Sequence, residues 1–396
     1  MIYYKYNVNI GGELMQLVRT MKLQLFLNDT ERDWLDQTLN SIKEGLNYTS
    51  QIAFENDGLS SKAKLQKIVY YDIREQFNLK AQMAVNVCTT VAGVYQSQKS
   101  NLKSSKSNKK NIILTKFDNV KVLYSYGRDY SFLKDGKIIS INTVEKRIKI
   151  PFKVPTYFHK YLNESWKFGA MEICEVDNKY FAHITVNKEI KEQPLELYDN
   201  VIGIDLGQNF LATLTDSKGY VKFYKGRYLK DIRAKYKHLR KQLSQKGTHN
   251  ANTKVNTINQ REMRFMTDIN HQVSRDIVNY AKQFNSIIVM EDLAGINLSC
   301  KVRKKDRYYR VSWAFNQLQE FIEYKALEVG LRVIYIDPAY TSQKCPKCGH
   351  THKLNRDKKN HIFKCRACGY TANDDYVASQ NIRDKGIELR HLESIS

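Results

Sequence analysis

Four cysteines near the carboxyl end of the sequence restrict the possible folds of this chain more than any other feature. They form two pairs with two residues between the members of each pair, and sixteen residues separate the pairs. Two such knuckles present four thiolates in a tetrahedron, which closes the coordination shell of a structural Zn²⁺ and leaves no open position for catalysis. Four unrelated free cysteines would rarely have this paired spacing by chance, so the spacing predicts a zinc ribbon. The predicted zinc ligands are Cys345, Cys348, Cys365 and Cys368.

Three histidines lie close to the cysteine pairs in the sequence, His350, His352 and His361. Because four thiolates already satisfy a zinc ion, we interpret these histidines as surface residues. The remaining cysteines stand singly, so no disulfide framework is expected.

The sequence shows no signal for secretion or for a membrane span. Its first residues lack an apolar segment with a small-residue cleavage site. The longest apolar run, residues 84–95, is shorter than the roughly 18 residues that a transmembrane helix needs. We therefore expect a cytoplasmic protein in a reducing compartment, with no membrane contact.

The charge of the chain favours a polyanionic partner. Its 64 lysines and arginines exceed its 41 aspartates and glutamates and give a formal net charge of +23. Phosphate neutralisation releases counterions, so a surplus beyond the needs of solubility points first to nucleic acid. A merely soluble basic surface is the alternative.

The length of 396 residues, with 42% hydrophobic residues, predicts two or three globular domains. Residues 21–28 have a strand pattern, and a helix is expected to begin near Thr30, which can cap it with Asp33 three residues later. A second helical stretch covers residues 62–94. The Ser- and Lys-rich residues 97–111 have the composition of a basic linker.

Between residues 112 and 191 the apolar period shortens to that of strands. Six short strand-like segments occur there, including a hairpin with Asp135-Gly136 at its turn. A series of short strands predicts a small barrel. We expect residues 21–28 to join it and the intervening helices to form an insertion.

From Leu195 onward, strands alternate with helices. Strand patterns occupy residues 200–207, 210–215, 220–225, 286–290 and 331–336, and helical patterns occupy residues 227–245, 260–284 and 313–329. The first three strands form a meander. The alternation predicts an α/β layer architecture.

Acidic side chains occur at three separate places in this α/β region. Asp205 lies within an apolar strand, Glu291 ends another, and Asp374 and Asp375 begin the helix-like segment after the cysteines. Burial without a partner would neutralise such carboxylates, so a cation or an opening to water is required. Hard oxygen ligands indicate Mg²⁺, and two such ions can support in-line displacement at a phosphodiester. Taken singly, each acid could instead be a turn cap, a surface acid or a helix cap.

Two basic stretches are candidates for nucleic-acid contacts. Residues 227–246 could follow a nucleic-acid backbone or simply form a solvated helix face. Residues 301–310 follow the Glu291 strand and combine lysine and arginine with tyrosine, so they could guide a single strand towards the acids. The predicted contacts are Arg233, Lys237, Arg240, Lys304, Lys305, Arg307, Tyr308, Tyr309 and Arg310.

Four segments together resemble the RuvC-like nuclease of the TnpB family, which is transposon-encoded and related to the compact type V CRISPR effectors. They are GIDLG at residues 203–207, VMEDL at 289–293, TSQKCPKCG at 341–349 and NDDYVASQNI at 373–382. The resemblance is specific from residue 195 to residue 382. Before residue 195 it depends on the opening MKLQLFLNDTERDWL and on the later strand-rich stretch.

This resemblance implies roles for the acids. Asp205 would be the first catalytic aspartate, Glu291 the second acid and Asp375 the third, with Asp374 as the fallback. All three would bind magnesium. One departure from the family pattern is Val377, where the family usually has asparagine.

The resemblance also implies a multidomain α/β fold class. An RNase H-like (RuvC) nuclease domain with an inserted zinc ribbon would follow a β-barrel wedge domain that carries a helical recognition insertion. The expected boundaries are an extension at 1–20, a wedge at 21–28 and 112–194, a recognition domain with its basic linker at 29–111, a nuclease domain at 195–340 and 370–396, and a ribbon at 341–369.

The function implied is that of an RNA-guided DNA endonuclease. A guide noncoding RNA would pair with target double-stranded DNA, the protein would read a short flanking motif, and two Mg²⁺ would support hydrolysis. Two alternatives remain: an RNA-guided DNA-binding repressor without cleavage, and a DNA strand-transferase on the same fold.

Overall fold

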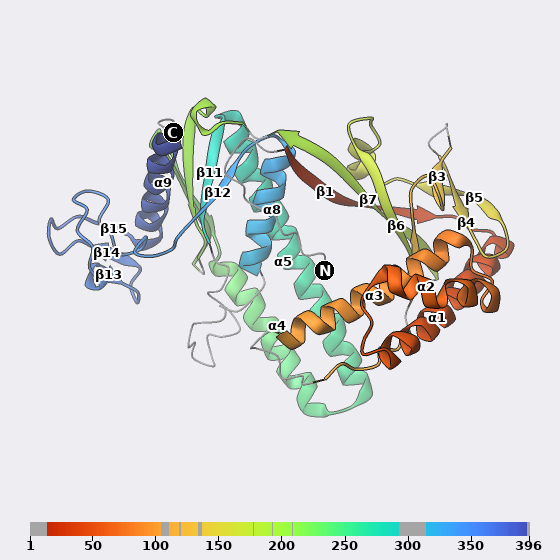
Figure 1. Cartoon of the computed structure of the whole chain (residues 1–396). Helices are drawn as coiled ribbons and strands as arrows, with labels where there is room; N and C mark the ends of the chain where they lie inside the picture. Colours follow the sequence, from red (N-terminus) through yellow and green to blue (C-terminus); the bar gives the residue numbers. More distant parts are fainter. Residues whose placement is uncertain are drawn as a thin grey trace. The chain divides into compact units, whose positions relative to one another are not determined.

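The computed structural model describes residues 14–103, 111–118, 120–133, 137–176, 178–191, 193–207, 209–292 and 314–393. The chain divides into two compact units (Figure 1). One consists of Val18–Lys188, and the other of Met1–Leu17 with Glu189–Ser396. Among the described residues, no helix combines the length and apolarity that crossing a membrane requires.

Three helices lie in the unit that begins at Val18. They are α1 (Asp29–Glu55), α2 (Lys62–Gln76) and α3 (Ala81–Lys103). The predicted cap of α1 is wrong, because Asn28 rather than Thr30 accepts the backbone N–H of Glu31 and completes a capping box with that residue.

The predicted second helical stretch is two helices. Asn78 adopts a φ of 53°, in the left-handed region that interrupts a helix, between the end of α2 and the start of α3. In addition, α3 continues to Lys103, so the first part of the predicted linker is helical, whereas residues 104–110 lie outside the described residues.

A seven-stranded sheet accompanies these helices, in the order β2-β6-β7-β1-β5-β4-β3. Its strands are β1 (Leu14–Leu25), β2 (Val122–Tyr124), β3 (Tyr130–Phe132), β4 (Ile138–Asn142), β5 (Arg147–Lys153), β6 (Lys167–Val176) and β7 (Lys179–Lys191). The expectation that the first strand joins the later ones is confirmed, because β1 lies between β7 and β5. This strand begins at Leu14, inside the predicted extension.

One of the strand predictions is wrong, because residues 112–117 contain no strand. The predicted Asp135-Gly136 turn lies outside the described residues. Closure of the sheet into a barrel stays a prediction.

The unit that contains the predicted acids has a five-stranded sheet, in the order β10-β9-β8-β11-β12. The strands are β8 (Asn200–Asp205), β9 (Phe210–Asp216), β10 (Val221–Lys225), β11 (Ser286–Glu291) and β12 (Val333–Ile336). As predicted, β8, β9 and β10 form an antiparallel meander. β11 pairs in parallel with both β8 and β12. Parallel strands need long crossover connections, and helices supply them here.

Helices cover both faces of this sheet. They are α4 (Arg227–Lys246), α5 (His249–Gln283), α8 (Ala314–Glu328) and α9 (Asp374–Glu393). In Figure 1, α9 lies on one side of the sheet, and α5 and α8 lie on the other. Their apolar faces and the strand residues form one buried cluster, in which Ile202 and Val289 are fully buried. The layered α/β architecture is confirmed for this unit.

Two glycines permit α9 to approach the sheet closely. A Cβ on Gly203 would lie 2.2 Å from the backbone oxygen of Ser379, and one on Gly386 would lie 2.4 Å from a methyl group of Val289. Real Cβ atoms do not approach other atoms so closely, so the backbones of α9 and β8 meet only because glycine has no side chain. Gly386 also faces Val201, so α9 runs antiparallel to β8.

The ribbon is a separate three-stranded sheet of β13 (Arg356–Asp357), β14 (Ile362–Lys364) and β15 (Thr371–Asn373). Its small core contains Cys345, Cys365 and Phe363, and Val377 of α9 packs into it. The departure from the family pattern at Val377 thus has a physical reason, since the side chain is fully buried against the ribbon.

Candidate active site and zinc ribbon

The structure brings Asp205, Glu291 and Asp375 to one edge of the five-stranded sheet. Because β8 and β11 are parallel with Ile204 opposite Met290, the next residue of each strand is an acid at the same carboxyl edge. The antiparallel course of α9 places its first turn there as well. The Asp375 Oδ2 atom lies 3.6 Å from the position that a Cβ on Gly207 would take, two residues after Asp205.

Burial makes all three carboxyl groups costly to ionise, and Asp205 is also close to the other two. Burial raises the pKa of Asp205 well above its ordinary value, and the neighbouring Glu291 and Asp375 raise it further. Burial also raises the pKa of Glu291 and the pKa of Asp375. Such a group of carboxylates needs a cation or contact with water to remain ionised.

Thr341 holds Glu291 from the segment that enters the ribbon. The Thr341 hydroxyl donates a hydrogen bond to Glu291 Oε1 and opposes the rise in the pKa of this carboxyl group. The side-chain amide of Gln319 on α8 donates to the backbone oxygen of Glu291 at 2.7 Å. Both ends of the Glu291 residue are thereby fixed.

Asp374 and Asp375 have different partners. Asp374 is fully buried and accepts a hydrogen bond from Arg356 Nε at 2.8 Å. Asp375 lies 3.8 Å from Arg356 Nη2 and raises the pKa of Asp205 more than Asp374 does. This arrangement favours Asp375 over Asp374 as the acid that faces the site.

The carboxylates are more open than the cysteine cluster. Within the described ranges, the only group of three or more histidine, cysteine or acidic side chains whose ligand atoms all lie within 4.8 Å of one another is the cysteine group. Carboxylate oxygens are the donors that Mg²⁺ prefers, so the donor set fits this metal.

The four cysteine sulfurs fit a tetrahedral zinc ion. Cys345 Sγ lies 3.7 Å from Cys368 Sγ, and Cys348 Sγ lies 3.6 Å from Cys365 Sγ. Zinc–sulfur bonds of about 2.3 Å in a tetrahedron require sulfurs separated by about 3.8 Å. A structural zinc ribbon is therefore supported by geometry as well as by spacing.

The predicted nucleic-acid contacts fall into three groups. Arg233 and Arg240 form ion pairs with Glu262 of α5, whose side chain is 10% exposed, so these guanidinium groups contribute to the packing of α4 on α5. Lys237 lies exposed on α4. The others, Lys304, Lys305, Arg307, Tyr308, Tyr309 and Arg310, lie outside the described residues.

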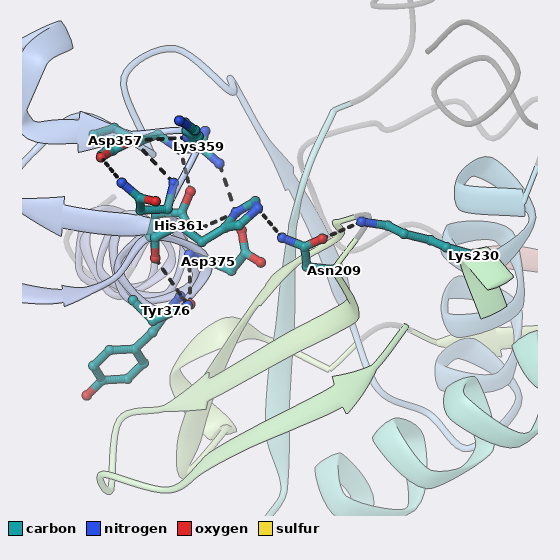
Figure 2. A network of polar contacts seen from close by, with 11 residues as sticks. Asn209, Lys230, Asp357, Lys359, His361, Asp375 and Tyr376 are labelled. Atoms are coloured by element: carbon teal, nitrogen blue, oxygen red, sulfur yellow. Dashed lines mark hydrogen bonds and ion pairs between the residues drawn. The ribbon is translucent and has the colours of Figure 1, made fainter. Parts of the chain in front are cut away.

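One of the three ribbon histidines makes a contact that the sequence did not indicate. The His361 side chain is 43% exposed, which agrees with a surface position, and its ring also contacts Asn209 of the loop after β8 (Figure 2). The sequence also gave no role to Thr341 or Arg356. Thr341 lies in the TSQKCPKCG segment that contributes to the family resemblance, so the sequence contained a signal for it. Nothing in the sequence around Arg356 distinguishes this residue from other basic residues.

Two family models match the chain. One is described as a Cas12f1-like TNB domain and matches residues 315–382, and the other is described as a probable transposase, OrfB_IS605, and matches residues 182–296. The two matches together include β8, β11, the ribbon and the start of α9.

Curated and solved proteins agree with these models. The CRISPR-associated endodeoxyribonuclease Cas12f1 of Sulfoacidibacillus thermotolerans is 32% identical over 255 residues, which are 61% of this chain and 58% of that protein. The chain thus matches little more than half the length of this relative. The fold resembles that of CasPhi-2 (Cas12j) bound to crRNA, with a TM-score of 0.50 at 11% identity, over 93% of this chain and 98% of the other.

A second relative is matched over nearly its whole length. The TnpB-like protein MJ0751 of Methanocaldococcus jannaschii is 31% identical over 270 residues, which cover 65% of this chain and 94% of that protein. Because nearly the whole of this relative is matched, and because the acids and the cysteines occur in the order that the TnpB resemblance requires, the chain belongs to the TnpB-like family.

Proposed function

We propose that this protein is an RNA-guided DNA endonuclease that hydrolyses phosphodiesters of target DNA. The observation that carries the proposal is the convergence of Asp205, Glu291 and Asp375 at one edge of the sheet, although up to 170 positions separate them in the sequence. A strongly basic chain has no evident structural need to gather acids whose pKa values are raised by burial and, for Asp205, also by the neighbouring acids.

Asp205, Glu291 and Asp375 would hold two Mg²⁺ ions. These ions supply a nucleophile at neutral pH and stabilise the charge that develops on the attacking and leaving oxygens. The protein fixes the ligands: Thr341 orients Glu291 through its hydroxyl, and Arg356 contacts both Asp374 and Asp375. No covalent enzyme intermediate is required.

The remaining predicted domains are part of this proposal. The five-stranded sheet with α4, α5, α8 and α9 would be the RNase H-like (RuvC) nuclease domain, and the seven-stranded sheet would be the wedge with α1–α3 as its recognition insertion. Zinc would hold the ribbon together without taking part in chemistry. Membership of the TnpB-like family supports this assignment.

Guide RNA and double-stranded DNA are the proposed partners. The net charge of +23 suits phosphate backbones, and the matched relative Cas12f1 is named a CRISPR-associated endodeoxyribonuclease. In RNA-guided systems, base pairing reads the target sequence while the protein reads a short flanking motif and the shape of the heteroduplex. Lys237 and the basic residues 301–310 are the proposed contacts.

The test is to purify the protein together with RNA from cells that carry its native locus and to sequence the bound RNA. The RNA–protein complex is then mixed with DNA libraries that contain a sequence complementary to the RNA, in Mg²⁺. We expect cleavage of the matched DNA and none with Asp205→Ala, whereas binding persists in that variant. Specific cleavage by RNA-free protein would contradict the guided function.

Two other outcomes would point to the alternatives. Binding to matched DNA without cleavage, in the wild type and in Asp205→Ala alike, would indicate a repressor. Joined rather than cut DNA ends would indicate a strand-transferase.

A further inference from the structure

A chain of side-chain contacts runs from α4 to the start of α9 through the ribbon. Lys230 in the first turn of α4 donates to Asn209 Oδ1, and Asn209 Nδ2 contacts His361 Nε2 (Figure 2). On the other side of the ring, His361 Nδ1 lies 3.6 Å from Asp374 Oδ1. These contacts join three elements that are far apart in the sequence, and they end beside Asp375.

The hydrogen-bonding capacities of these groups fix their orientations. An ammonium group only donates, so the Asn209 atom that faces Lys230 is the oxygen, and the amide nitrogen must face His361. That nitrogen also donates, so His361 Nε2 accepts and the ring hydrogen lies on Nδ1, directed towards Asp374. Within the part of the chain that the structure describes, both His361 Nδ1 and Asp374 Oδ1 are buried without a hydrogen-bond partner, and they lie 3.6 Å apart, so a small movement would pair them.

The backbone reinforces the same connection. The His361 carbonyl oxygen accepts from the backbone N–H of Asp374 at 3.3 Å and from the Asn373 side-chain amide at 3.4 Å. Asn373 caps α9 by accepting the backbone N–H of Asp375. His361 itself adopts a φ of 56°, a conformation that a residue other than glycine maintains only where its surroundings compensate the strain.

The other end of the chain of contacts is equally well held. The Asn209 backbone oxygen accepts from the Gly226 N–H at 2.8 Å, immediately before α4. Asn209 therefore has its backbone fixed by the loop before α4 and its side chain held between Lys230 and His361.

We propose that Lys230, Asn209 and His361 form a bridge that positions the third acid. His361 and Asn209 are positioning residues: they fix the turn between β13 and β14 on the loop after β8, so that Asp374 keeps Arg356 in place and Asp375 faces Asp205. This inference rests on the proposed role of Asp375 as a metal ligand. Residues that orient metal ligands through a second hydrogen bond commonly change metal affinity about 10-fold to 100-fold when they are replaced.

The bridge is tested by measuring the affinity of the full zinc-loaded chain for Mn²⁺. Titration calorimetry gives this affinity in the absence of RNA and DNA. Asn209→Ala removes the middle of the bridge from outside the ribbon. His361→Asn keeps a donor near the position of Nδ1 and suits the left-handed backbone, but it removes the Nε2 acceptor. We expect each variant to weaken Mn²⁺ binding by about 10-fold, with unchanged zinc content and thermal midpoint.

The double variant separates a bridge from two independent effects. Because Asn209→Ala and His361→Asn break the same link, their combination is expected to bind Mn²⁺ no more weakly than either single variant. Multiplied losses in the double variant would overturn the bridge. His350→Asn is the matched control, since it makes the same substitution at an exposed ribbon histidine, and its Mn²⁺ affinity is expected to equal that of the wild type.

The result that overturns the proposal most directly is unchanged Mn²⁺ affinity in Asn209→Ala and His361→Asn. The same conclusion would follow if Asp375→Asn left Mn²⁺ binding unchanged, because then there would be no third ligand to position. Loss of affinity in the bridge variants, in a protein that nevertheless cleaves no RNA-matched DNA, would support the bridge and defeat the proposed function instead.

Discussion

Asp374 and Asp375 are adjacent in the sequence, yet their surroundings assign them different roles. Asp374 is fully buried and ion-paired with Arg356, as expected of a group that ties the ribbon to α9. Asp375 contributes to the raised pKa of Asp205 and lies farther from Arg356. A helix presents successive residues about 100° apart, so one of two neighbours can face the ribbon while the other faces the site.

Substituting each aspartate in turn distinguishes these roles. We expect Asp374→Ala to lower the free energy of unfolding by about 3 kcal/mol, because it leaves Arg356 without its buried partner. We expect Asp375→Asn to abolish cleavage while leaving stability unchanged or slightly higher. Urea unfolding and a cleavage assay on both variants check the assignment, and the opposite pattern would make Asp374 the third acid.

The raised pKa of Asp205 has a consequence for stability. A carboxyl group whose pKa is higher in the folded chain than its ordinary value of 3.8 binds more protons when folded, so the folded state loses stability as the pH rises from that value towards the raised pKa. Within this window the loss is about 1.4 kcal/mol for each pH unit. The ionised acid is therefore a cost to the metal-free fold.

Asp205→Asn removes this cost and is expected to raise the thermal midpoint of the chain in buffer with zinc but no magnesium. The gain should increase with pH across the window and should shrink when Mg²⁺ is added, because the ion stabilises the wild type alone. Thermal melts of both proteins between pH 4 and pH 8 measure it. A midpoint that falls at every pH would show that Asp205 is held by partners rather than strained.

At the scale of elements, the glycine of β8 determines where α9 lies. A side chain at residue 203 would meet the backbone of α9 at Ser379 and Arg383, and a backbone cannot move aside as a flexible side chain can. The helix that carries Asp375 would have to shift away from the strand that carries Asp205. The close approach of strand and helix is thus a condition for the site.

Gly203→Ala is accordingly expected to reduce cleavage at least 100-fold and to destabilise the fold by about 2 kcal/mol, in the range of overpacking. Gly93→Ala is the matched control. Gly93 lies within α3, a Cβ there meets nothing within 4 Å, and alanine should stabilise that helix by roughly 0.5–1 kcal/mol. Equal cleavage by both variants would contradict the packing argument.

The elements that could be predicted from the sequence are those with strong local patterns. The strands of Asp205 and Glu291 are predominantly apolar runs, and both were expected within two residues of their observed ends. The start of α5 could not be predicted, because the polar residues 249–259 carry little apolar periodicity. Packing on α4 stabilises this part of the helix instead. Likewise, Glu262 of α5 forms ion pairs with Arg233 and Arg240 of α4, and no local sequence pattern indicates these contacts.

The candidate site divides in the same way. Its acids and cysteines could be identified because their residue types and spacing restrict the chemistry. Thr341, Arg356 and His361 act through long-range hydrogen bonds, and these depend on how the ribbon packs against the sheet rather than on any sequence period. A single sequence therefore indicated the ligands but not the groups that orient them.

At the scale of the whole molecule, the ribbon connects the four-cysteine site to the proposed catalytic acids. It is a short segment with a very small core of Cys345, Cys365, Phe363 and Val377. Such a segment depends on its metal for stability, whereas the five-stranded sheet has a large apolar core of its own. Thr341, at the entrance to this segment, contacts Glu291, and Arg356, within the segment, contacts Asp375.

Removal of zinc is therefore expected to abolish cleavage without unfolding the rest of the chain. Cys348→Ser with Cys365→Ser, which takes one ligand from each knuckle, should retain most of the far-ultraviolet circular dichroism and the bound RNA. It should weaken Mn²⁺ binding by about 10-fold or more, because Arg356 and His361 lose the support of the ribbon. Calorimetry on this variant measures the effect, and Cys174→Ser controls for the loss of a thiol elsewhere. If Mn²⁺ affinity and cleavage survived zinc loss, the ribbon would be independent of the acids, and the contacts of Thr341 and Arg356 would have no functional role.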